Sequence, residues 1–124
     1  MFDFSDDAEQ HLLCIKLTGF WSMETFERYR LEFQDRVRQI HARAGLCKIF
    51  IDTSEFPIQS SDVAAGFRDL VDGQQHRKNM LVAIVLPGSL AKLQAERAVG
   101  APHVRFFFGE PVEALDWLRA QPLG

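Results

Sequence analysis

Met80-Leu81-Val82-Ala83-Ile84-Val85-Leu86 is the stretch that decides the fold, because all seven side chains are apolar. A strand with one wet face alternates apolar and polar residues, whereas a strand covered on both faces is apolar throughout. Pro87-Gly88 follows at once and breaks regular structure. We therefore predict that residues 80–86 form a central strand of a parallel sheet, with helices on both sides.

Strands and helices alternate on either side of this stretch. The predicted strands comprise residues 2–4, 11–18, 47–52, 80–86 and 104–108. The first predicted helix begins at an N-cap, Ser22, and ends before Gly45. Its apolar residues recur every three or four positions and form one buried stripe, which consists of Phe26, Tyr29, Phe33, Val37, Ile40 and Ala44.

The opposite side of this helix carries Glu24 with Arg28 and Glu32 with Arg36, each pair four residues apart, and is expected to be a solvated face. A second helix is capped by Ser60 or Ser61, and a third spans about 89–100. The fourth begins at Pro111, with Val112, Leu115 and Leu118 buried.

This order predicts an α/β fold with a mostly parallel (βα)4 sheet and an additional N-terminal strand. The first two strands form a hairpin, and each later strand follows a helix, as right-handed crossovers require. The length of 124 residues fits one domain over 1–124.

Composition narrows the classes of function. The net charge of −3 gives no general attraction to nucleic acid, and no apolar run is long enough to span a bilayer. The acidic start lacks a signal-peptide pattern, so a cytoplasmic location is expected, with Cys14 and Cys47 reduced and buried. The four histidines are scattered without metal-site spacing, so we predict no metal and no cofactor.

Three segments together resemble the SpoIIAA-like family, relatives of the STAS domains, over nearly the whole chain. They are Leu13-Cys14-Ile15-Lys16-Leu17-Thr18-Gly19, Ile51-Asp52-Thr53-Ser54-Glu55-Phe56, and Val104-Arg105-Phe106-Phe107 with the following Glu113-Ala114-Leu115-Asp116-Trp117-Leu118. The last pair is similar to the ending of a branch whose biochemical role is poorly defined. The resemblance implies four strand–helix units after an extra first strand.

In the antagonist branch of that family, an Asp-Ser-Ser-Gly turn opens the second helix and its first serine is phosphorylated. The resemblance places Ser61 at this phosphoacceptor position. The present sequence reads Gln59-Ser60-Ser61-Asp62 there, so Ser60 replaces the aspartate and Asp62 precedes the usual glycine position. A helix start also favours anions, while the simpler interpretation of both serines is helix capping.

In a parallel sheet, ligands collect at the C-terminal ends of the strands, and this rim holds the candidate site. Its aromatic members either line an apolar groove or fill the core, as large aromatics often do. The candidate residues for ligand or partner binding are Phe20, Trp21, Asp52, Phe56, Ser60 and Ser61.

Two functional hypotheses follow. The first is a non-enzymatic binding or regulatory module that recognises a protein partner or an apolar small molecule at this rim. The alternative is a small enzyme that uses Asp52 or His76 as a general base in a rim pocket; no catalytic residue is assigned. A homodimer is expected if one face of the phenylalanine run 106–108 is left uncovered.

Overall fold

The computed structural model describes residues 1–7, 9–73, 80–86, 104–108 and 111–121. Two predictions lie outside these residues: the helix at about 89–100 and the position of His76. None of the described helices combines the length with the apolar character that crossing a membrane requires.

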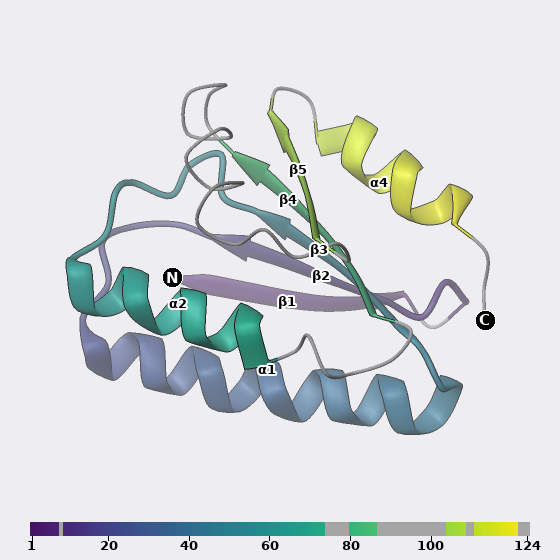
Figure 1. Cartoon of the computed structure of the whole chain (residues 1–124), viewed down its shortest axis with the longest axis horizontal. Helices are drawn as coiled ribbons and strands as arrows, with labels where there is room; N and C mark the ends of the chain where they lie inside the picture. The colour runs from purple at the N-terminus through teal and green to yellow at the C-terminus, as the bar shows by residue number, and fades with distance from the viewer. Residues whose placement is uncertain (8, 74–79, 87–103, 109–110, 122–124) are drawn as a thin grey trace.

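Five strands form one mixed sheet in the order β1-β2-β3-β4-β5 (Figure 1). β1 (Phe2–Asp7) and β2 (Leu12–Leu17) form an antiparallel pair, as the predicted hairpin requires. β2, β3 (Cys47–Asp52), β4 (Met80–Leu86) and β5 (Val104–Phe108) are joined by parallel pairings. β4 lies between β3 and β5, which confirms that the wholly apolar stretch is an interior strand.

Helices cover both faces of the sheet. α1 (Met23–Ala44) and α2 (Ser61–Gly73) lie on one face, and α4 (Pro111–Ala120) lies on the other (Figure 1). The predicted limits of α1 are confirmed: the Ser22 hydroxyl accepts a hydrogen bond from the Thr25 N–H at 3.2 Å. Gly45 ends the helix in the left-handed conformation, with φ 74°.

The core is divided between these two faces by the alternation of side chains along each strand. Ile49 and Ile51 of β3 face α1 and α2, whereas Phe50 between them faces α4. β4 behaves in the same way, with Val82 and Ile84 on the first face and Ala83 and Val85 on the second. The two-sided burial explains why both strands are rich in apolar residues.

The prediction for α4 was partly wrong. Leu118 is fully buried and Leu115 partly buried, but Val112 is 59% exposed and Ala114 is buried in its place. Ala114 and Leu118 are four residues apart and share one side of the helix, whereas Val112, two residues before Ala114, points to nearly the opposite side.

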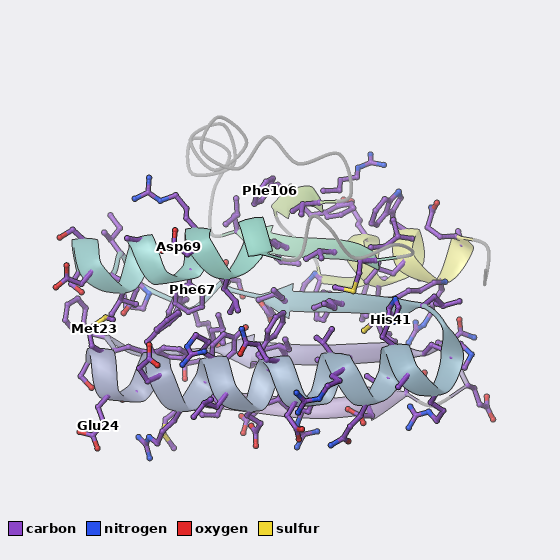
Figure 2. The ribbon with its side chains drawn as sticks, turned by 60° about the horizontal axis from the view of Figure 1, so that its bottom comes forward. Met23, Glu24, His41, Phe67, Asp69 and Phe106 are labelled. Carbon is purple, nitrogen blue, oxygen red and sulfur yellow. The ribbon has the colours of Figure 1, made fainter. Side chains whose placement is uncertain are left out.

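Aromatic rings fill the space between the sheet and the first two helices. Tyr29 lies at the centre, with ring centroids of six neighbours within 5.3–6.4 Å; these are Phe2, Phe4, Trp21, Phe26, Phe33 and Phe67. Phe67 points from α2 toward α1 (Figure 2). Burial of the phenol raises the pKa of Tyr29. This aromatic cluster supports the end of the molecule where the candidate site lies.

Candidate functional site

Exposed apolar side chains gather at the rim, the end of the molecule where β2 and β3 terminate and α1 and α2 begin. Of the six large apolar side chains that are exposed in the described residues, four lie here; they are Met1, Phe20, Met23 and Ile58. Phe20 is 69% exposed and Ile58 is 96% exposed. The first strand begins at the same end, because Phe2 pairs with Leu17 at the end of β2 (Figure 1).

One glutamine joins the two loops that carry Phe20 and Ile58. The Gln59 Oε1 accepts a hydrogen bond from the Trp21 N–H at 2.8 Å, and its Nε2 donates to the Gly19 carbonyl at 3.0 Å and to the Pro57 carbonyl at 2.8 Å. All three of these hydrogen bonds join the Gln59 side chain to backbone groups, so they fix the two loops relative to each other. Gln59 was not predicted as a site residue, because nothing local in the sequence distinguishes a loop glutamine that bonds to a residue 38 positions away.

The three predicted rim aromatics take different positions. Phe20 is exposed, Phe56 is half-buried, and Trp21 is only 2% exposed. The Trp21 indole N–H donates to the Thr18 carbonyl at 2.9 Å, and its ring packs edge-on against Phe56 with centroids 5.2 Å apart. Trp21 and Phe56 therefore build the supporting wall of the rim, and Phe20 presents its ring to solvent.

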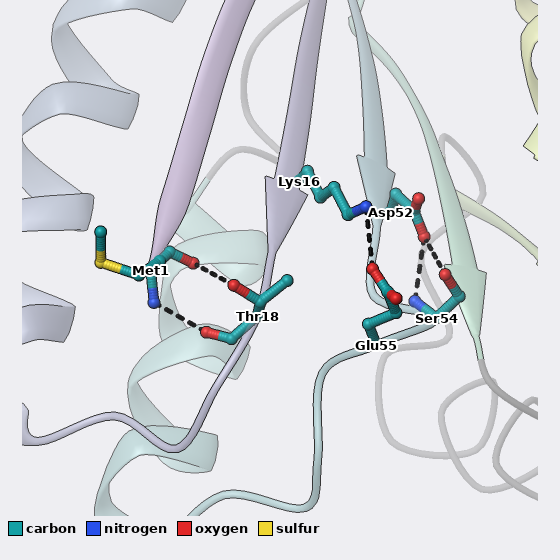
Figure 3. Close-up of polar contacts among 6 residues, drawn as sticks. All are labelled: Met1, Lys16, Thr18, Asp52, Ser54 and Glu55. Atoms are coloured by element: carbon teal, nitrogen blue, oxygen red, sulfur yellow. Dashed lines mark hydrogen bonds and ion pairs between the residues drawn. The ribbon is translucent and has the colours of Figure 1, made fainter.

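A surface hollow of ≈ 510 Å³ lies beside these aromatics. It falls in the size range of small-molecule sites. Its wall is formed by Met1, Phe2, Gly19, Phe20, Trp21, Thr25 and Arg28. Hydrogen bonds to Thr18 hold Met1 in this wall. The Met1 amine donates to the Thr18 carbonyl at 2.7 Å (Figure 3), and the Thr18 N–H donates to the Met1 carbonyl at 2.9 Å.

Asp52, a predicted polar residue of the rim, forms its side-chain hydrogen bonds within the loop that follows β3. The Asp52 Oδ1 accepts hydrogen bonds from the Ser54 N–H at 2.9 Å and the Ser54 hydroxyl at 2.6 Å (Figure 3). Such bonds shape the turn that follows the strand. Lys16 forms an ion pair with Glu55 at 2.8 Å, and this hydrogen bond and charge raise the pKa of Lys16. Asp52 thus acts as a turn former at the end of β3.

The two serines at the start of α2 have separate positions. Ser60 is the cap, since its hydroxyl accepts from the Val63 N–H at 3.3 Å and its carbonyl accepts from the Ala64 N–H at 2.9 Å. Ser61 is the first residue of the helix and is exposed, with Asp62 beside it. Ser61 is therefore accessible from solvent.

The cysteines and the other titratable groups form no metal site in the part of the chain that the structure describes. Cys47 is buried, as predicted, but Cys14 is only half-buried because it points away from α1 and α2, where α4 covers it incompletely. Partial burial raises the pKa of the Cys14 thiol.

Comparison with known proteins identifies a solved structure of the same architecture. No family model and no curated protein matches the sequence. The chain is similar to an uncharacterised protein of the DUF3478 family from Shewanella loihica PV-4, which has a SpoIIAA-like fold. The two share 27% identity at a TM-score of 0.64, over 94% of this chain and 93% of the other. The resemblance seen in the sequence is thereby confirmed, and the chain has a SpoIIAA-like fold.

Proposed function

We propose that this chain is a non-enzymatic binding module that recognises the apolar part of a small molecule or of a protein partner at the rim. One observation carries the proposal: Met1, Phe20, Met23 and Ile58 expose large apolar side chains at one end of the molecule, and Met1 and Phe20 line the ≈ 510 Å³ hollow there. Apolar groups that gather on one exposed surface mark a site of interaction, whereas single exposed ones need no explanation.

The support beneath the exposed side chains favours binding over loose loop structure. Gln59 fixes the two loops to each other, and Trp21 rests on the aromatic cluster below them. A site of this kind is largely formed before a ligand arrives, so little ordering cost opposes binding. Covering the Phe20 ring would stabilise a complex by about 1.5–3 kcal/mol.

The enzyme hypothesis has weaker support. A general base works in a site where it lies within hydrogen-bond reach of the substrate proton, and other polar groups commonly orient it there. Asp52 already accepts two hydrogen bonds from Ser54 at one oxygen, in a turn, and His76 lies outside the described residues. Among the described residues the Asp52 carboxylate hydrogen-bonds to Ser54, its neighbour in the turn, and to no histidine or second carboxyl group, and we do not propose catalysis.

Further parts of the proposal rest on the sequence. They are the complete (βα)4 arrangement, a cytoplasmic location, a homodimer, and phosphorylation of Ser61 as a switch of partner binding. The exposed position of Ser61 at the same rim favours the last of these. None of them is needed for the test below.

Replacing Phe20 tests the proposed function. We expect Phe20→Ser to weaken binding of the neutral apolar dye Nile red by about tenfold or more, since the Phe ring contributes about 1.5–3 kcal/mol of burial. Val112→Ser is the matched control, because Val112 is exposed to a similar extent on α4, on the opposite face of the sheet. Native mass spectrometry of the purified protein shows in parallel whether a small molecule or a protein travels with it. Equal dye affinities for the two variants would contradict a site at the rim.

A further inference from the structure

Arg28 differs from the other arginines in the first two-thirds of α1. Arg30 forms an ion pair with Glu27 at 2.7 Å, and Arg36 and Arg38 are likewise paired with carboxylates. Arg28 has no ion pair or hydrogen bond within the described residues, although it lines the rim hollow. The predicted pair of Glu24 with Arg28 does not form, so this guanidinium keeps its donors available.

The residues that form the wall of the hollow include the Arg28 guanidinium and the Met1 amine, which donates to the Thr18 carbonyl, and no carboxylate. Its seven lining residues combine apolar surface from Phe2, Phe20 and Trp21 with the Thr25 hydroxyl and the Arg28 guanidinium. Glu24, one turn before Arg28, is not among them and projects outward at the start of α1 (Figure 2). Glu24 and Arg28 are both exposed, as the prediction of a solvated face expects, and Arg28 also borders the hollow.

A ligand that matches this wall needs both an apolar part and a negative head. Guanidinium groups bind carboxylates through two parallel N–H···O bonds, and such charge-assisted bonds are stronger than neutral ones. The apolar wall beside Arg28 lowers the local dielectric and strengthens that attraction relative to bulk water. An amine-headed molecule would meet repulsion at the same place.

We propose that the rim hollow binds a single-chain amphiphile with an anionic head, such as a medium-chain carboxylate. Arg28 binds the head, and Phe20 with Trp21 contacts the chain. This inference rests on the proposed function, to which it adds the chemical class of the ligand. The hollow, with a volume of ≈ 510 Å³, accommodates one such molecule and not a folded partner.

The test compares decanoate with decanol, two ligands that share the chain and differ in the head. Each displaces Nile red from the full chain below its micellar concentration. We expect decanoate to bind about tenfold more tightly than decanol to the wild type, a preference that weakens with added salt. Arg28→Gln should remove the preference, and Arg28→Lys should keep part of it.

Arg43→Gln is the matched control, because Arg43 is exposed near the other end of α1 and also has no partner in the described part of the chain. Thermal unfolding verifies that each variant is folded. Equal binding of decanol and decanoate would overturn the anionic head while leaving the apolar rim site intact. An equal loss in Arg43→Gln would overturn the assignment to Arg28. Failure of both ligands to displace the dye would overturn this inference, and failure of the dye itself to bind would overturn the proposed function.

Discussion

Lys48 is the one charged side chain that is fully buried among the described residues, at 1% exposed. Its Nζ donates to the carbonyl of Leu118 at 2.7 Å and to that of Gln121 at 2.9 Å, at the end of α4. The last carbonyls of a helix lack partners and carry partial negative charge. Lys48 therefore caps α4 from β3 and ties the C-terminal helix to the middle of the sheet.

Truncating this side chain should destabilise the protein. Lys48→Ala leaves a cavity and removes the lysine donor from two carbonyls, so we expect the free energy of unfolding to fall by about 2–4 kcal/mol in urea denaturation. Lys48→Met restores most of the volume and should lose less. Lys16→Ala is the control on the neighbouring strand, where the lysine is exposed. A loss in Lys48→Ala no larger than in that control would show that the α4 cap contributes little.

The same residue predicts a pH dependence. Burial lowers the pKa of Lys48 below its ordinary value of 10.5. Between the lowered pKa and 10.5, the unfolded chain binds a proton that the folded chain has released. The free energy of unfolding therefore rises with pH across that window, and this gain is lost again as the pH falls to the pKa of the folded state. The wild type should thus gain stability relative to Lys48→Met as pH is raised toward 10.5. If the difference in unfolding free energy between the wild type and Lys48→Met stayed constant over this range, a lowered pKa of Lys48 would be contradicted.

At the scale of elements, α1 and α2 are tightly packed where Gly66 meets Phe26. A Cβ atom on Gly66 would lie 2.7 Å from Cε2 and 2.8 Å from Cζ of the Phe26 ring. That ring is 2% exposed and packs edge-on against Phe67 at 5.0 Å, so it has little room to move. Glycine is therefore required here by packing, although it is a poor helix former.

Gly66→Val should lower the free energy of unfolding by about 1–3 kcal/mol through overpacking, despite the better helix propensity of valine. Ala64→Val, on the exposed side of the same helix, changes propensity without meeting Phe26 and should cost less than about 0.7 kcal/mol. Chemical denaturation of both variants measures the difference. Equal stabilities would mean that the helices separate freely at this contact.

The elements themselves were predictable because their signals are local. Periodicity and caps placed the limits of α1 at Ser22 and Gly45, and short apolar runs placed β3 and β4, with Lys48 as the exception in β3. The error at Val112 arose because a short helix with several apolar residues does not reveal which side will face the sheet. The region of the candidate site was predicted from topology, since parallel strands end at one rim.

The details of that site depended on contacts that no local pattern encodes. Gln59 bonds to Trp21 across 38 residues, and Lys48 bonds to Leu118 across 70. The i,i+4 spacing of Glu24 and Arg28 predicted an ion pair. Surface pairs of this kind contribute only a few tenths of a kcal/mol, so small competing interactions are enough to keep the two side chains apart. The sequence therefore could not predict that Arg28 is unpaired within the described residues and lines a hollow; the structure was needed for both.

At the scale of the whole molecule, β3 and β4 are shared by the two cores. Each contributes alternate side chains to the α1–α2 face and to the α4 face. A loss of packing on one face displaces strands whose other side chains hold the second face. Two layers built on common strands should therefore unfold together, since neither has a sheet of its own.

The two tryptophans make this cooperativity measurable, because one reports on each layer. Trp21 lies in the core beneath α1 and α2, and Trp117 packs against Phe107 on the α4 face with centroids 5.8 Å apart. In Trp117→Phe the fluorescence reports on the first layer alone, and in Trp21→Phe on the second. We expect each fluorescence transition in urea to coincide with the far-ultraviolet circular dichroism transition of the same variant, whatever the substitution does to its midpoint. An earlier fluorescence change in Trp21→Phe would show that α4 leaves the sheet first, and Lys48 would then be too weak a cap to couple the two faces.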